Sequence, residues 1–548
     1  MEPIFTDKQL NNMSREDLIS LMKIVQEQTK KKDTEIQLLK DKQKELEFLN
    51  AMLSDRLTLA QRKQFGASSE KYAEGYEQMN LFNEAEASAD AETEELFEEI
   101  RPSSYKRKKR KGKKEEDLSN FETVETRTYK LEGEARYCPE CGKKYNVVTK
   151  EIVKRLRFVP AKFAVEEEIT YVYSCSKCGS MKRPEKEPSL IRGSIATPSL
   201  VAGIMNAKYV NGMPLARQER EFARYDLDLS TKTMANWIIN CADRYLKPLY
   251  QLMKEELLES RYIHCDESRI QVLGEPEQKG TTQNWMWVYL TDEFSGSPQM
   301  VLFDYERTRA GYHPVNFLRD GFHGYLTCDG YQAYHSLGEG IIVSGCFTHA
   351  RRRFDAALTA LKKDFTKEQL KETVAYQAMS RIGILYKIEE MLHDKTPEEK
   401  YEERQKQSRP VLDAMFEWLH TMEDSVDRSS LIGDAILYTL NQEVYLRRYL
   451  EDGHLSIDNN SAERALKNFA VGRRNWLFAK SVRGADASAL VYSITETALL
   501  NHLKPYAYLT YILDELRKMG VFPKEEELKK LLPWSEDLPE YCRTKLKK

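Results

Sequence analysis

The segment at residues 262–273 reads YIHCDESRIQVL, and the fold assignment starts from it. It is a β-forming run in which Asp266 stands among apolar neighbours. Further short β-forming runs follow at residues 284–290, 300–303, 324–330 and 340–346, with a helical segment expected around residues 314–319. The sequence therefore predicts three strands, a helix, a strand, a helix and a strand, in this order.

That order of elements is typical of a ribonuclease-H-like α/β fold. In it, Asp266 lies within the first strand and Asp329 at the end of the fourth. Neighbouring parallel strands lie less than about 5 Å apart, so the two carboxylates can share a pair of cations. Mg²⁺ or Mn²⁺ prefers oxygen ligands, and two such ions stabilise both the attacking and the leaving oxygen of a phosphoryl transfer. One aspartate at a strand end more often caps a turn, but two in this strand order predict a metal site, which needs a third carboxylate.

Two C-x-x-C pairs predict a structural zinc site. The cysteines are Cys138, Cys141, Cys175 and Cys178, and a glycine follows each pair. Strand-forming segments at residues 155–158 and 168–173 lie between the pairs and are expected to form a hairpin. Four thiolates at about 2.3 Å suit tetrahedral Zn²⁺, and redox-active dithiols are the alternative. Nine cysteines in the whole chain are too few, and odd in number, for a disulfide scaffold.

Residues 197–260 are expected to be helical throughout. Three helices are predicted, at residues 199–209, 215–225 and about 231–245. Ser230 is placed to cap the third of them. A short helix, a tight turn and a capped helix have the spacing of a helix-turn-helix, in which Lys232 and Asn236 would contact bases or phosphates. An ordinary helical hairpin has the same spacing, so the pattern alone leaves both interpretations open.

A heptad pattern spans residues 14–60, where Leu18 at position a begins a largely apolar seam. This seam predicts an intermolecular coiled coil and hence a homo-oligomer, although a single helix packed on its own protein would show the same pattern. Residues 83–99 are acidic and residues 106–114 are basic, so this stretch is predicted to be a disordered linker. The basic block either binds phosphates non-specifically or neutralises the acidic block beside it.

Composition excludes several classes of protein. Of 548 residues, 41% are hydrophobic and 31% are charged, which allows apolar cores in about three to five modules. The net charge of −3 excludes a globally basic nucleic-acid coat protein, although local basic patches remain compatible with it. No run approaches the roughly 18 apolar residues of a membrane span, and the N-terminus lacks the layout of a signal peptide. A cytoplasmic protein without a membrane partner is expected.

Motifs along nearly the whole chain resemble the transposases of the insertion sequence 66 family, which are bacterial DDE enzymes. Besides the double cysteine pair, the resemblance rests on HCDES at residues 264–268, CDGY at 328–331, HARRRF at 349–354, IDNNSAERAL at 457–466 and GRRNW at 472–476. The motifs RKQFGASSEK at 62–71, GMPL at 212–215 and LLPW at 531–534 also match. The one difference is Asp-Glu-Ser where the family pattern has Asp-Glu-Thr, and the two hydroxyls form similar local bonds.

The resemblance implies DNA transposition by a DDE triad, with Asp266, Asp329 and Glu463 at the matching positions. The surroundings of Glu463 agree, because it begins a helix-forming run with basic residues beside it and one turn on. A simple Glu–Lys helix pair is the alternative explanation of that pattern. Glu496 is the rival third carboxylate, although its helix has the pattern of a core helix.

The predicted reaction cleaves a phosphodiester at the transposon end, after which the freed 3′-hydroxyl attacks target DNA. Double-stranded DNA is therefore the expected partner, in a nucleoid-associated bacterial protein, and helper proteins of the same element would be further partners. The residues expected to contact DNA phosphates are Arg351, Arg352, Arg353, Arg464, Lys467, Arg473 and Arg474. Cys346 and His349 follow the fifth strand and are placed to approach the scissile phosphate. A second zinc site is not expected there, because no further ligand pair is visible.

Two other functions remain compatible with the sequence: a non-catalytic zinc-containing DNA-binding regulator, and a metal-dependent nuclease without strand transfer. The predicted domains are a coiled-coil region (1–75), a linker (76–118), a zinc-binding module (119–190), a helix-turn-helix-like region (191–260), a first part of the catalytic core (261–357), a helical insertion (358–450), a second part of the core (451–505) and a C-terminal tail (506–548).

Overall fold

The computed structural model describes residues 143, 163–174, 181–182, 184–276, 282–319, 321–520 and 523–545. The chain divides into two compact units, one of residues 85–186 and one that contains residues 1–84 and 187–548. The predicted coiled coil, the charged linker and the four cysteines of the predicted zinc site lie outside the described residues.

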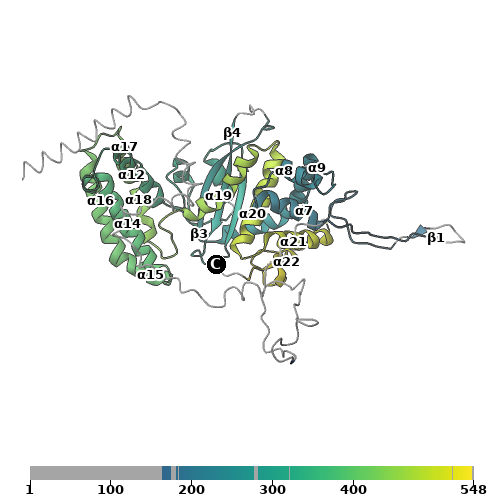
Figure 1. Ribbon diagram of the computed structural model, residues 1–548. Coiled ribbons are helices and arrows are strands. Elements are labelled where there is room, and N and C mark those ends of the chain that lie inside the picture. Colours follow the sequence, from purple (N-terminus) through teal and green to yellow (C-terminus); the bar gives the residue numbers. More distant parts are fainter. Residues whose placement is uncertain are drawn as a thin grey trace, which may run out of the picture. The chain divides into compact units, whose positions relative to one another are not determined.

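Residues 187–548 contain a mixed five-stranded sheet (Figure 1). Its strands, in spatial order, are β5 (Met300–Glu306), β4 (Gln283–Thr291), β3 (Tyr262–Gln271), β6 (Gly324–Thr327) and β7 (Ile341–Ser344). β3, β4 and β5 pair antiparallel, whereas β6 and β7 run parallel to β3. β4 is buried along most of its length, because both faces of the sheet are covered. The α/β class expected from the sequence is confirmed.

The parallel pairing of β3 and β6 brings two aspartates to the same level. Its register places His264 opposite Thr327. Asp266 and Asp329 each lie two positions further along their segments. Asp266 is still within β3, and Asp329 lies two residues after Thr327, the last residue of β6. The pairing thus brings two acidic residues that are 63 positions apart in the sequence to the same end of two neighbouring strands.

Helices that precede and follow the strands in the sequence surround the sheet (Figure 1). Those before it are α7 (Pro198–Met205), α8 (Leu215–Ala223), α9 (Thr231–Cys241) and α10 (Lys247–Glu259), with π-helical turns at Asn206–Val210 and Ala242–Leu246. Between the strands, along the sequence, lie α11 (Tyr312–Leu318) and a 3₁₀ turn at Gln332–Ser336. After the strands come α19 (Asn460–Trp476), α20 (Val482–Leu500), α21 (Pro505–Met519), α22 (Glu525–Lys529) and a 3₁₀ turn at Glu540–Cys542. Of these helices, α10, α19 and α20 pack directly on the strands. α20 is buried on nearly every side because it lies between β5 and the helices that precede the sheet. Among the described helices, none is both long and apolar enough to cross a bilayer.

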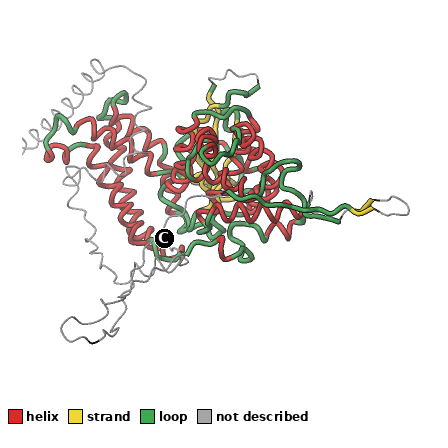
Figure 2. Tube along the Cα trace, turned by 45° about the vertical axis from the view of Figure 1, so that its right-hand side comes forward, coloured by secondary structure: helices red, strands yellow, loops and turns green. Residues whose placement is uncertain are grey.

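A helical bundle is inserted between β7 and α19 and lies beside the sheet (Figure 2). Its elements are α12 (Phe347–Leu361), α13 (Lys367–Glu372), α14 (Val374–Leu392), α15 (Pro397–Glu403), a π-helical turn (Arg404–Ser408), α16 (Arg409–Glu423), α17 (Leu431–Asn441), α18 (Glu443–Arg447) and a 3₁₀ turn (Arg448–Leu450). Tyr262 and Tyr325 of the sheet pack into the core of this bundle. The buried Arg404 guanidinium donates to Glu389 and to the carbonyl oxygens of residues 449, 452 and 455. These bonds hold the segment that leads into α19 against the bundle.

The unit of residues 85–186 contains a short antiparallel pair, β1 (Tyr173–Ser174) with β2 (Met181–Lys182). The strand expected over residues 168–173 is wrong in extent, because residues 163–172 are described without strand structure. Ile169 and Tyr171 are exposed, so their alternation with polar residues buries no face. A strand also needs a partner for its N–H and C=O groups, which side-chain alternation does not supply.

Candidate active site

The sheet contributes two aspartates to the candidate site. Asp266 Oδ1 accepts a hydrogen bond from the backbone N–H of Glu267 at 2.8 Å. Asp329 Oδ1 accepts the backbone N–H of Tyr331 at 2.9 Å, which turns the chain away from the sheet after β6. Both aspartates are half-buried. Each of these bonds engages Oδ1, so Oδ2 of each carboxylate remains available as a ligand atom.

Glu463 approaches from the helical side. It lies in the first turn of α19, and its side chain is 23% exposed. One of its oxygens, Oε2, accepts a hydrogen bond from the Arg352 guanidinium on α12. The other, Oε1, is buried and has no hydrogen-bond partner within the described part of the chain. Buried acceptors are normally satisfied, so this oxygen is suited to bind a cation or a ligand.

The charges of these carboxylates act on one another. Burial, together with the neighbouring carboxylates of Glu267, Asp329 and Glu463, raises the pKa of Asp266 well above its ordinary value. Carboxylates whose charges act on one another in this way repel one another unless a cation shares them. Oxygen ligands, an unpartnered buried oxygen and mutual repulsion together fit a hard divalent cation such as Mg²⁺.

Glu267 is a buried acidic neighbour that the sequence analysis missed. Its side chain is 1% exposed, and it forms an ion pair with Arg309 and accepts a hydrogen bond from the Tyr334 hydroxyl. Burial and the charge of Asp329 raise the pKa of Glu267, although Arg309 opposes them. The signal in the sequence was a second acidic residue next to Asp266 in a β-forming run. Alternation along a strand places consecutive side chains on opposite faces, so this carboxylate needs a partner of its own.

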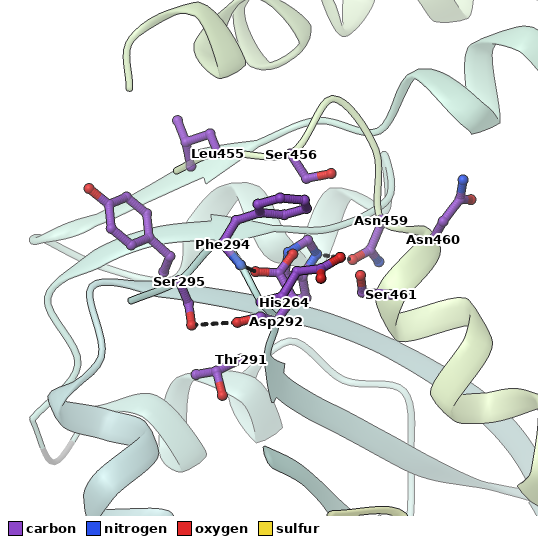
Figure 3. A network of polar contacts seen from close by, with 12 residues as sticks. His264, Thr291, Asp292, Phe294, Ser295, Leu455, Ser456, Asn459, Asn460 and Ser461 are labelled. Atoms are coloured by element: carbon purple, nitrogen blue, oxygen red, sulfur yellow. Dashed lines mark hydrogen bonds and ion pairs between the residues drawn. The ribbon is translucent and has the colours of Figure 1, made fainter. Parts of the chain in front are cut away.

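A buried polar network fixes the start of α19 against β3 (Figure 3). Asn459, directly before α19, donates to the carbonyl oxygen of Cys265 at 2.9 Å, and its side-chain oxygen lies 3.0 Å from His264 Nδ1. His264 Nε2 lies 3.1 Å from Oδ2 of Asp292, which follows β4. Burial disfavours a charge on His264, but Asp292 and Asn459 outweigh it and raise the pKa of this histidine. The network therefore sets the position of the helix that carries the glutamate relative to the strand that carries the first aspartate.

A comparison with known protein families shows to which family the chain belongs. The family model described as "Transposase IS66 family" matches residues 193–487, which is more than half of the chain and contains Asp266, Asp329 and Glu463. The chain belongs to the IS66 transposase family. The resemblance seen in the sequence motifs is thereby confirmed.

Further matches cover other parts of this IS66 transposase. "IS66 C-terminal element" matches residues 493–534, and "Transposase C of IS166 homeodomain" matches residues 52–120. "Zinc-finger binding domain of transposase IS66" matches residues 135–179, which contain all four cysteines of the predicted zinc site. Among curated proteins, "Uncharacterized protein y4hP" of Sinorhizobium fredii is 30% identical over 412 residues, covering 72% of this chain and 73% of the relative. "Uncharacterized protein y4jD" of the same organism is 28% identical over 418 residues, covering 74% of this chain and 79% of the relative.

The rival third carboxylate of this transposase, Glu496, lies in the buried helix α20. Both of its oxygens accept hydrogen bonds from the Asn468 side chain, each at 3.1 Å. Burial raises the pKa of Glu496 to about 7, and the bond from Asn468 opposes this increase. Glu463, in contrast, is one of the charges that raise the pKa of Asp266. The charge of Glu463 thus acts on Asp266, whereas Glu496 is bonded to a neighbouring residue in the core.

We expect Glu496→Gln to stabilise the protein at pH 8 and to have little effect at pH 5. The pKa of Glu496 in the folded state, about 7, lies above the ordinary 4.5, so wild-type stability falls as pH rises from about 4.5 to 7. This difference corresponds to about 3 kcal/mol at pH 8, which the uncharged glutamine recovers. Urea unfolding of both proteins at the two pH values measures the effect. An equal change at both pH values would contradict the assignment of Glu496 as a buried ionisable core residue.

Basic residues predicted to contact DNA lie on α12 and α19, the two helices that carry Arg352 and Glu463. On α12, Arg351 and Arg352 are exposed, whereas Arg353 is half-buried and pairs with Asp434. On α19 lie Arg464, which is exposed, and Lys467, Arg473 and Arg474, which are half-buried. Two exposed arginines are next to Glu463: Arg352 pairs with it, and Arg464 follows it in the sequence.

The helix-turn-helix-like region lies elsewhere on the same unit. Ser230 caps α9 as predicted, because its side chain accepts the backbone N–H of Thr233. Lys232 and Asn236 are exposed one turn apart on this helix. Figure 1 shows α9 and α12 on opposite sides of the sheet, so these two residues are not brought together with Glu463. Trp476, at the end of α19, is half-buried and packs edge-on against a tyrosine ring of the core.

Proposed function

We propose that this transposase cleaves DNA at the transposon ends and joins the freed 3′-hydroxyl to target DNA, with Asp266, Asp329 and Glu463 as its catalytic carboxylates. The observation that supports the proposal is the arrangement of these residues around the end of the β3–β6 pairing and the start of α19. The β3–β6 register sets the two aspartates at one level, and α19 adds a glutamate whose buried oxygen has no partner in the described structure. The raised pKa of Asp266 supports a site that is completed by cations.

The sheet topology supports a ribonuclease-H-like core for this reaction. Three antiparallel strands are followed by two strands parallel to the first, and the first strand is central. The central strand carries the first carboxylate, and the strand beside it leads to the second. The third comes from a helix that packs on the central strand after a long insertion.

Two Mg²⁺ or Mn²⁺ ions, when bound, would activate water and stabilise the attacking and leaving oxygens. The chain itself would hold and orient the three carboxylates. Asp266 and Asp329 accept hydrogen bonds from backbone N–H groups, and the buried network before α19 fixes the start of the helix that carries Glu463. Arg352 neutralises one oxygen of Glu463 while its guanidinium remains 49% exposed. A guanidinium at this position can contact a DNA phosphate by charge-assisted hydrogen bonds as the strand enters the site.

The other parts of the chain serve DNA binding and assembly in this proposal. The zinc-finger domain holds Zn²⁺ through Cys138, Cys141, Cys175 and Cys178, and Lys232 and Asn236 of α9 add contacts to transposon-end DNA. The heptad seam in residues 14–60 pairs protomers, because two transposon ends must be brought together. Helper proteins of the same element would act on this assembly.

The test uses full-length protein and DNA carrying the inverted repeats that flank its gene. With Mg²⁺ we expect cleavage that exposes a 3′-hydroxyl at the transposon end, followed by joined products with a target plasmid. With EDTA we expect binding without either product. Cleavage without joined products would identify a nuclease, and binding without cleavage under all metal conditions would identify a regulator.

A further inference from the structure

A second cluster of metal-binding side chains lies against the proposed catalytic site. It consists of Cys346, His349 and Glu463, each of which offers one ligand atom, and these atoms lie within 4.8 Å of one another. Cys346 directly precedes α12, His349 lies in the first turn of α12, and Glu463 lies in the first turn of α19. The sequence shows only the first two as neighbours, because the third comes from a helix more than a hundred residues further on.

Two buried atoms of this cluster are unsatisfied. His349 Nδ1 and Glu463 Oε1 are buried without a hydrogen-bond partner in the described part of the chain. Such atoms are rare in folded proteins, and two of them in one three-residue cluster point to a bound ion. The Cys346 side chain is buried as well, at 2% exposure.

The backbone around the cluster is held in place by three hydrogen bonds. The backbone N–H of Asn459 donates to Cys346 Sγ at 3.1 Å. Phe347 N–H donates to the carbonyl oxygen of Ile457 at 3.2 Å, and Gly345 N–H donates to that of Tyr445 at 3.0 Å. The starts of α12 and α19 are therefore joined directly, so the three ligands rest on rigid elements.

The set of donors selects the kind of ion. A thiolate, an imidazole nitrogen and a carboxylate oxygen are typical zinc ligands, whereas Mg²⁺ takes oxygen ligands almost alone. Tetrahedral Zn²⁺ with bonds of about 2.0–2.3 Å places its ligands roughly 3.5 Å apart. Rotation of the three side chains would close the remaining distance, and a water would fill the fourth position.

We infer that Cys346, His349 and Glu463 form an inhibitory zinc site, separate from the zinc finger. Its physical basis is the sharing of one ligand. A Glu463 carboxylate oxygen engaged by Zn²⁺ on the side of α12 is withdrawn from the cations held by Asp266 and Asp329. Zinc binding and Mg²⁺-dependent cleavage then exclude each other. Only the inhibition rests on the proposed function, since zinc binding requires nothing but the three side chains.

The first test counts zinc in the full-length protein. Wild type, Cys346→Ser, His349→Gln and the control Cys241→Ser are equilibrated with Zn²⁺ at a buffered free concentration, and zinc per chain is measured by elemental mass spectrometry. Cys241 is also a buried free cysteine, but it lies in α9. Wild type and Cys241→Ser should hold one zinc more per chain than the other two variants. Serine is a favourable residue directly before a helix, so Cys346→Ser is expected to fold, and thermal melting of each variant verifies this.

Equal zinc content in all four proteins would overturn the site. The second test titrates Zn²⁺ into the Mg²⁺-dependent cleavage reaction and compares each variant with its own zinc-free rate. Zinc should lower the wild-type rate at least about tenfold and leave the rate of His349→Gln within about twofold, and equal inhibition of both would overturn the shared-ligand mechanism. A wild type that holds the extra zinc but cleaves no DNA under any metal condition would contradict the proposed function while supporting the site.

Discussion

Asp266→Asn, Asp329→Asn and Glu463→Gln should each lower the rate of transposon-end cleavage by at least about 10²–10³-fold. Each substitution keeps the size of the side chain and removes the charge that holds a cation. The three residues act as one set of ligands, so double variants should be scarcely slower than single ones. Gel-based cleavage of a labelled end measures the rates. Binding to the same DNA should change little, because affinity comes from basic residues rather than from the carboxylates.

Glu496→Gln is the matched control for this series. Like Glu463→Gln, it replaces a helical glutamate by glutamine. The Glu496 carboxylate, however, is buried and accepts its hydrogen bonds from Asn468. We expect it to cleave at close to the wild-type rate. If Glu463→Gln cleaved normally while Glu496→Gln did not, Glu496 would be the third ligand. If all four variants cleaved like the wild type, the carboxylate mechanism would be wrong.

Asn459→Ala should both destabilise the protein and impair cleavage. The substitution leaves the Cys265 carbonyl oxygen and His264 Nδ1 without the partners they have in the folded protein. Each unpaired buried group costs about 1–3 kcal/mol, so the loss of both partners should lower the free energy of unfolding by about 2–6 kcal/mol. A displacement of Glu463 by about 1 Å is enough to slow a reaction by about 10²-fold. Urea unfolding and the end-cleavage assay, both at a temperature where the variant is folded, measure the two effects.

Asn284→Ala separates positioning from simple loss of stability. Asn284 is fully buried in β4, accepts the Val272 N–H at 3.2 Å and donates to the Arg307 carbonyl oxygen at 3.2 Å. Its loss should cost a similar free energy of unfolding, yet these bonds do not involve the start of α19. We expect Asn284→Ala to retain most of its cleavage activity when folded. Equal loss of activity in both variants would show that Asn459 acts only through stability.

The sequence predicted those parts of the site that follow from local pattern and strand order. Ser230 could be placed as a helix cap because capping is settled within three residues of the chain. Asp266 and Asp329 could be placed on adjacent strands because the alternation of strands and helices fixes which strands are neighbours. Strand length was less predictable. The side chains of residues 168–173 alternate as in a strand, but in this described segment the pairing with β2 begins only at Tyr173.

The contacts that complete the site could not be predicted, because they join distant segments through side chains. Arg352 and Glu463 are 111 positions apart, and His264 and Asn459 are 195 apart. No periodicity links such pairs, and each depends on how the bundle seats α12 against α19. The same limit explains why Cys346 and His349 showed no third zinc ligand in the sequence.

The long insertion between β7 and α19 also determines when a newly made chain acquires its proposed activity. Glu463 lies 134 positions after Asp329, so at about 5–20 residues per second the ribosome needs roughly ten seconds to add it. During that interval the residues matched by the zinc-finger family model have already been synthesised, whereas α20 and α21, on which α9 and α7 pack, have not. If the zinc finger binds transposon ends as proposed, a protein still being translated would occupy those ends before it can break them. A chain that terminates prematurely within the bundle would, on the same proposal, bind the ends through its zinc finger and leave them uncut.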